Sequence, residues 1–187
     1  MGAVKIPSSF LTSVRTFARK VHEPIVFGTS SGHKKPQIEH IQEVADLVWI
    51  SGGTDAEIAA AWLHDSVEDT ETKLEDISRL FGSDVAELVH GLTDLPEMTD
   101  LPTDQRKLAQ SRRVRSKGPG VRRIKLADQI SNVRYVVTDP PSNWTHENNR
   151  MYCAGAKLIA DECKGISPLL DSLFEQEYRK AVAHFEL

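Results

Sequence analysis

Hydrophobic residues recur along this chain at the spacing of amphipathic helices, and no segment alternates between apolar and polar residues as a strand would. The first helix is expected to begin after Ser8 or Ser9, either of which can cap its N-terminus. Further helices are expected over residues 38–50, 55–67 and 72–82, from residue 83 onward, on both sides of residues 118–120, and over residues 143–163 and 168–185. The pattern therefore predicts an all-α protein.

Glycine, proline and small polar residues separate these helical segments. Residues 28–36, which read GTSSGHKKP, are polar throughout and are expected to form a loop. Prolines at positions 96, 102, 140 and 141 interrupt the helical pattern further along the chain. Because we find no internal repeat, low-complexity tract or interdomain linker, residues 1–187 are expected to form a single domain.

Composition excludes several classes of function. A net charge of −4 and an aromatic content of 6% argue against a nucleic-acid partner. No apolar stretch is long enough to span a membrane, and residues 1–7 contain no signal-peptide core. The two cysteines, Cys153 and Cys163, suggest neither a zinc site nor a disulfide framework. We therefore expect a cytoplasmic protein, and its oligomeric state is left open.

The segment His64-Asp65-Ser66-Val67-Glu68-Asp69-Thr70 is the strongest chemical signal in the chain. It ends an apolar run, and residues 55–67 contain no glycine or proline, so a helix is expected to continue through it. On a helix His64 and Glu68 share one face, as do Asp65 and Asp69. Burying so many ionisable groups is unfavourable unless a cation or a polar substrate offsets the cost. A metal-dependent hydrolase site is the simplest interpretation.

Two further residues can complete a metal site. His40 lies at the start of the preceding helix, and Asp128 lies inside an apolar helical segment. Taken singly, His40 could be an ordinary helix-start histidine and Asp128 a buried ion-pair partner. Together with His64 and Asp65 they form a mixed nitrogen and oxygen set that suits Mn²⁺, Fe²⁺ or Zn²⁺. Such a metal lowers the pKa of bound water and polarises phosphorus.

Basic residues concentrate in the stretch between residues 106 and 125, although the chain is acidic overall. They can form a positive rim that attracts a polyphosphate, or simply the solvated face of two helices. The residues are Arg106, Lys107, Arg112, Arg113, Arg115, Lys117, Arg122, Arg123 and Lys125. Lys125 lies one helical turn from Asp128, which favours a role beside the metal.

The segments that carry this chemistry resemble the HD-domain phosphohydrolases, and within them the hydrolase domain of the RelA/SpoT family. The similarity is to small stand-alone (p)ppGpp hydrolases, including the metazoan SpoT homologue, and extends over roughly residues 10–170. It rests on AAAWLHDSVEDT at residues 59–70, LEDI at 74–77, FGSDVAELV at 81–89, KLAD at 125–128, and Asn132.

The resemblance implies an HD-domain helical bundle and a manganese-dependent enzyme, with other divalent metals as options. It implies removal of pyrophosphate from the 3′ position of (p)ppGpp, the nucleotide of the stringent response, to leave GDP or GTP. His40, His64, Asp65 and Asp128 match the metal ligands, Glu68 and Asp69 match the acids that position or activate water, and Asn132 matches a position near the nucleotide. Lys34, Lys35 and Lys125 would neutralise phosphate charge.

The chain also departs from the family pattern. The family usually has His-Pro where this chain has His40-Ile41, and a tyrosine before that histidine that is missing here. Two alternatives therefore stay open. The first is an HD-domain phosphatase for another nucleotide, such as NADPH or a deoxynucleotide. The second is a nucleotide-binding module with little turnover.

Overall fold

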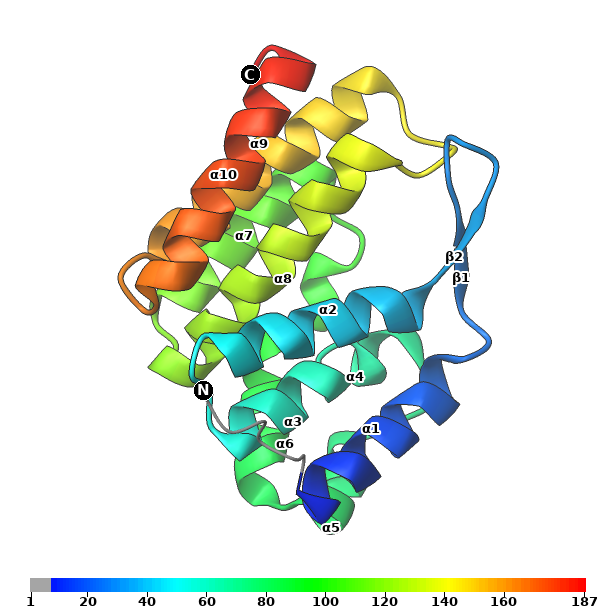
Figure 1. The fold of residues 1–187 in the computed structure, drawn as a ribbon, viewed down its shortest axis with the longest axis vertical. Coiled ribbons are helices and arrows are strands. Elements are labelled where there is room, and N and C mark those ends of the chain that lie inside the picture. Colours follow the sequence, from blue (N-terminus) through cyan, green and yellow to red (C-terminus); the bar gives the residue numbers. More distant parts are fainter. Residues whose placement is uncertain (1–7) are drawn as a thin grey trace, which may run out of the picture.

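The computed structural model describes residues 8–187, almost all of whose regular structure is helical (Figure 1). The all-α prediction is confirmed. The helices are α1 (Ser9–His22), α2 (Gln37–Ile50), α3 (Asp55–Leu63), α4 (Ser66–Asp69), α5 (Leu74–Phe81), α6 (Ser83–Leu92), α7 (Thr103–Arg115), α8 (Pro119–Thr138), α9 (His146–Cys163) and α10 (Pro168–Phe185), with a 3₁₀ turn at Pro96–Met98. Residues 1–7, on which the expectation of no signal peptide rests, lie outside the described part.

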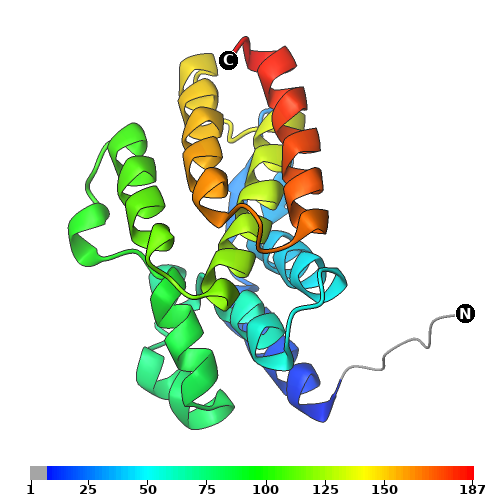
Figure 2. The same cartoon turned by 90° about the vertical axis from the view of Figure 1, so that its left-hand side faces the viewer.

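Helix α8 lies at the centre of the bundle. It packs against α9 and α10 on one side and against α2, α3 and α6 on the other, and the two views show this arrangement (Figures 1 and 2). Its apolar positions, such as Ile124, Ile130 and Val133, are fully buried in a continuous hydrophobic cluster. Burial of this apolar surface is the main favourable contribution to folding. A polar residue such as Asp128 on this helix is thereby held inside the bundle.

Side-chain caps fix where several helices begin. The hydroxyl of Ser8 accepts the N–H of Leu11 at 3.2 Å, which confirms the predicted start of α1. Thr54 caps α3 in a reciprocal capping box with Glu57. This cap fixes the start of the helix that leads directly to His64.

The predicted continuous helix over residues 55–67 is wrong at its most important point. Helix α3 ends at Leu63, and the separate turn of α4 begins at Ser66. His64 and Asp65 lie in the turn between these two helices, and Nε2 of His64 lies 3.2 Å from Asp65 Oδ1.

The predicted loop over residues 28–36 contains part of a small hairpin. Strands β1 (Val26–Gly28) and β2 (Lys34–Pro36) pair antiparallel, and Gly32 adopts φ 85° in the turn between them. Three-residue strands are too short to show alternation in the sequence.

The hairpin is tied to the loop between α8 and α9. The carboxylate of Asp139 accepts the backbone N–H of Ser31 at 2.9 Å and the hydroxyls of Ser30 and Ser31 at 3.0 and 2.7 Å. An isolated bridge joins Thr29 to Pro141. These bonds hold two segments that are far apart in sequence side by side just beyond the C-terminal end of α8 (Figure 1).

Two further observations bear on the sequence analysis. Cys153 and Cys163 are both buried and free, so they form no disulfide with each other. No helix within residues 8–187 is long and apolar enough to cross a membrane.

Candidate active site

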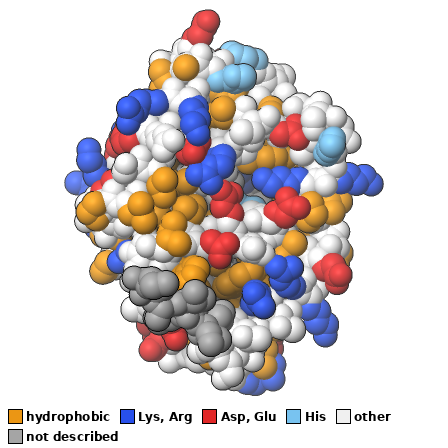
Figure 3. All heavy atoms as spheres, in the orientation of Figure 1, with side chains coloured by type: hydrophobic (Ala, Val, Ile, Leu, Met, Phe, Trp, Pro, Cys, Tyr) orange, Lys and Arg blue, Asp and Glu red, His pale blue; other side chains and the backbone are white. Residues whose placement is uncertain are grey.

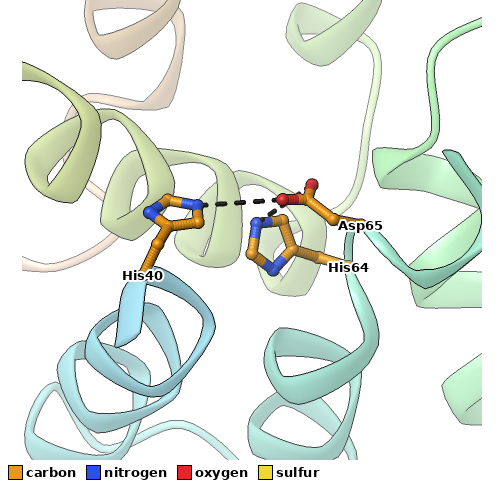
Figure 4. Close-up of side chains that lie close together, drawn as sticks. All are labelled: His40, His64 and Asp65. Carbon is orange, nitrogen blue, oxygen red and sulfur yellow. Dashed lines mark ion pairs between the residues drawn. The ribbon is translucent and has the colours of Figure 1, made fainter. Parts of the chain in front are cut away.

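His40, His64 and Asp65 point toward one another from two helices (Figure 4). His40 lies in the first turn of α2, and His64 and Asp65 follow the last turn of α3. The Nε2 atom of His64 lies 3.2 Å from Asp65 Oδ1, and Nε2 of His40 lies 3.9 Å from Asp65 Oδ2. One ligand atom from each residue lies within 4.8 Å of the others. This spacing allows all three to bind a single ion.

Asp128 on α8 adds a second carboxylate. Its Oδ1 lies 3.5 Å from Nε2 of His40 and 4.0 Å from Nε2 of His64. Burial disfavours its charge, but Lys125 at 3.1 Å and the two histidines hold the pKa of Asp128 well below its usual range. Asn132 donates to the same carboxylate at 2.5 Å. Asp128 is therefore ionised and held in place.

Hydrogen bonds on the far side of each imidazole set its tautomer. His64 Nδ1 donates to the carbonyl of Ala61 at 2.8 Å, which leaves Nε2 with a free lone pair. The hydroxyl of Ser131 donates to Glu43 at 2.6 Å, so it accepts from His40 Nδ1 at 2.9 Å. Both Nε2 atoms thus present lone pairs toward the two carboxylates when the rings are neutral.

The residues fit a divalent metal. Nε2 of His64 is buried and has no hydrogen-bond partner among residues 8–187, although such atoms are nearly always paired. Burial opposes protonation of His40, but Asp128 and Asp65 raise the pKa of its imidazole, which shows that this point attracts positive charge. Two imidazoles and two carboxylates suit Mn²⁺, Fe²⁺ or Zn²⁺. The structure thus brings all four predicted ligands together.

Glu68 and Asp69 lie beside this cluster on α4. Glu68 accepts the backbone N–H of Asp94 at 2.8 Å, and Asp69 accepts the side-chain amide of Gln37. Desolvation and the negative charge of Asp65 raise the pKa of Glu68 to about 7, although its side chain is open to the cavity. The same two causes raise the pKa of Asp69. Glu68 can therefore accept a proton near neutral pH.

A buried histidine that the sequence analysis did not single out orients Gln37. Nδ1 of His22 lies 2.9 Å from Gln37 Oε1, and its Nε2 lies 3.1 Å from the hydroxyl of Ser66. Because the amide oxygen of Gln37 faces His22, its amide nitrogen faces Asp69. These bonds tie α1 and α2 to α4. No sequence motif marks the contact, since it joins residues from three separate elements.

The cluster opens into a cavity of about 480 Å³. Lys35, Lys125 and Asn132, three of the predicted substrate-binding residues, line it, and Nζ of Lys35 lies 4.2 Å from the centre of the Tyr135 ring. Lys34 is exposed on β2 and is not among the lining residues. Aromatic side chains that the sequence analysis did not assign to the site also form part of the wall: Phe27, Tyr135, Trp144 and Tyr152.

Charged residues behind the cluster support His40. Arg134 of α8 pairs with Glu43 of α2 and, at 3.1 Å, with Glu177 of α10. Acidic and basic side chains are correspondingly intermingled over α2 and α8 in the middle of the visible face (Figure 3). The pairing holds Glu43 where it accepts from Ser131, and so it fixes the ring of His40.

Comparison with known families decides the classification. The family model described as HD domain matches residues 15–152. The chain belongs to the HD-domain family. Membership in this family implies a divalent metal, in agreement with the donor set formed by His40, His64 and Asp65.

Individual HD-domain relatives cover most of the chain. A Drosophila melanogaster protein named guanosine-3′,5′-bis(diphosphate) 3′-pyrophosphohydrolase MESH1 is 31% identical over 78% of this chain and 80% of its own length. The Xenopus tropicalis protein of the same name is 33% identical with the same coverage. A solved structure, described as a metazoan orthologue of SpoT that hydrolyses ppGpp, matches with a TM-score of 0.85 and 27% identity, over 95% of this chain and 98% of that one.

We expect Glu43→Gln to weaken binding of a divalent metal by about 10- to 100-fold, the usual cost of losing a partner behind a ligating histidine. Isothermal titration of purified protein with Mn²⁺ measures this directly. Glu39→Gln is the matched control, because Glu39 is exposed on the same helix. Equal affinities for the two variants would show that Glu43 does not support His40.

Proposed function

We propose that this protein is a manganese-dependent hydrolase that removes pyrophosphate from the 3′ position of (p)ppGpp and leaves GDP or GTP. The observation that carries the proposal is the convergence of His40, His64, Asp65 and Asp128 beside a cavity with lysines in its wall. Relatives that share about a third of their residues with this chain carry this activity in their names. The lysines of the wall can pair with the phosphates of a nucleotide that carries two diphosphate groups.

The four ligands would hold the metal against the diphosphate that is cleaved. When bound, the metal supplies a Lewis acid that polarises phosphorus and makes water more acidic. Water attacks the phosphorus next to the 3′ oxygen, the bond between them breaks, and pyrophosphate leaves. The 3′ oxygen gains a proton and becomes a hydroxyl. Lys35 and Lys125 offset the negative charge of the phosphates.

We assign the proton acceptor to Glu68 and an orienting role to Asp69. Glu68 is open to the cavity, and its pKa of about 7 is matched to a base that works near neutral pH. Asp69 is already engaged by the amide of Gln37. That contact fixes its carboxylate beside the cluster, where it can hold the attacking water in place.

The substrate assignment is tested by incubating purified protein with ppGpp and Mn²⁺ and following GDP and pyrophosphate. We expect both products in equal amounts, none in EDTA, and none from Asp65→Ala protein with unchanged helical circular dichroism. NADPH and a deoxynucleoside triphosphate complete the panel. Faster cleavage of either would replace ppGpp as the substrate, and tight nucleotide binding without any product would identify a binding module.

The role of Glu68 predicts a loss of about 10²- to 10⁴-fold in kcat for Glu68→Gln, the usual contribution of a positioned general base. Glu71→Gln is the control, because Glu71 is exposed just beyond α4 and does not line the cavity. The Mn²⁺ affinity of both variants should stay within a few-fold of wild type. If Asp69→Asn lowers kcat far more than Glu68→Gln does, the two roles are reversed.

A further inference from the structure

The basic stretch between residues 106 and 125 divides into two groups in the structure. Several of its arginines donate to backbone carbonyls near helix ends: Arg113 to His90 and Thr93, Arg122 to Glu162, and Arg123 to Ser51. These residues stabilise the packing of helices. Within residues 8–187, only Arg106, Lys107 and Lys125 of this stretch line the cavity.

Lys107 is the least expected of these three. Its side chain is 3% exposed, and its Nζ donates to Gln129 Oε1 at 3.0 Å and lies 3.9 Å from the centre of the Tyr152 ring. No ion pair formed within residues 8–187 includes Lys107, whereas Lys125 pairs with Asp128 at 3.1 Å. Lys107 is thus a buried amine at the cavity wall that forms no ion pair with any of the described residues.

Such an arrangement is unfavourable while the cavity holds only water. Burial lowers the pKa of Lys107 to about 7, and the attraction of Asp128 only partly offsets burial and the repulsion of Lys125 and Arg106. A buried charge normally occurs with a partner of opposite sign. An anion in the cavity would supply that partner.

The packing of α7 against α9 fixes the position of Lys107. A Cβ atom on Gly155 would lie 2.6 Å from both Cβ and Cγ of Lys107, so only glycine lets the lysine stem lie flat against α9. The stem is therefore held in one place, with the amine at the cavity wall. Arg106, its neighbour, also lines the cavity, and its buried Nε has no hydrogen-bond partner among the described residues.

We propose that Lys107 and Arg106 form a second anion subsite, on α7, that binds the phosphate group of the nucleotide that is not cleaved. The inference rests on the proposed function, because the metal ligands take the cleaved group. Lys35 on β2 and Lys125 beside Asp128 provide positive charge at other points of the same cavity. Basic residues at several separate points of the cavity favour a nucleotide with phosphate groups at two positions of its ribose over a nucleotide with a single phosphate chain.

GDP is the probe, because it keeps the uncleaved 5′ diphosphate and lacks the cleaved group. Binding is measured by isothermal titration in EDTA, so neither the metal nor turnover enters the result. Lys107→Gln should weaken GDP binding by about 10- to 100-fold, the usual loss for a charge-assisted hydrogen bond. Binding of guanosine, which has no phosphate, should be unchanged.

Two further variants keep the test decisive. Arg112→Gln removes the same charge from an exposed position on α7 outside the cavity and should leave GDP binding unchanged. Arg106→Gln should weaken GDP binding as well, and it alters a less buried position if Lys107→Gln proves unstable. With ppGpp, both cavity variants should raise KM about 10-fold or more and change kcat by less than threefold.

The possible results separate this inference from the proposed function. If the wild type binds GDP and the two cavity variants bind it weakly, the subsite stands even when ppGpp is not hydrolysed. Equal GDP affinity for Lys107→Gln, Arg106→Gln and Arg112→Gln would overturn it, as would a wild type that does not bind GDP at millimolar concentration. A fall in kcat at unchanged KM would also overturn it, because it would place Lys107 at the cleaved group.

Discussion

Two imidazoles and two carboxylates meet inside a helical bundle, and the rest of the structure depends on how their charges are balanced. Asp128 is 5% exposed and His64 is 2% exposed, so neither group is hydrated as it would be in the unfolded chain. Burying polar groups at this density costs free energy that must be recovered from partners. Lys125 and Asn132 stabilise Asp128 directly. The unpartnered nitrogen of His64 still needs a cation, and a divalent metal balances the cluster best.

Hydrogen bonds on the far side of the two imidazoles hold both histidine ligands in place. Ser131 and Glu43 orient His40, and the backbone of α3 orients His64. These contacts tie the ligands to α2, α3 and α8. The packing of these helices therefore also sets the positions of the ligands. The contact from Gln37 to Asp69 extends this arrangement to α4. Because the ligands are already ordered, metal binding costs less conformational entropy.

The sequence could predict the helices, because they depend on local patterns, and it pointed to a ligand set through the His64-Asp65 pair and the family resemblance. Apolar spacing and capping residues specify helices within a few turns, and the His64-Asp65 pair with acids close behind is a compact signal. The end of α3 at Leu63 could not be predicted, because residues 55–67 contain no glycine or proline that would mark it. The hairpin was missed for a related reason, since its strands are fixed by Asp139 more than a hundred residues away.

Local sequence patterns also predicted only part of the cavity wall. Lys125 was predicted from its helical spacing to Asp128, and Asn132 from the family resemblance, whereas Lys107 gave no more signal than the other basic residues around it. Its burial against Gly155 of α9 depends on the packing of α7 against α9, which no local pattern encodes. Conversely, Lys34 and Lys35 are neighbours on a strand and therefore point to opposite sides, and only Lys35 lines the cavity.

We expect four side chains from three segments to form one metal centre. Crystals of the protein soaked in Mn²⁺ and measured at the manganese absorption edge test this expectation. A single strong anomalous peak should lie within bonding distance of His40, His64, Asp65 and Asp128 and should disappear in Asp65→Ala crystals. A peak elsewhere, or no peak at this cluster at saturating Mn²⁺, would contradict it.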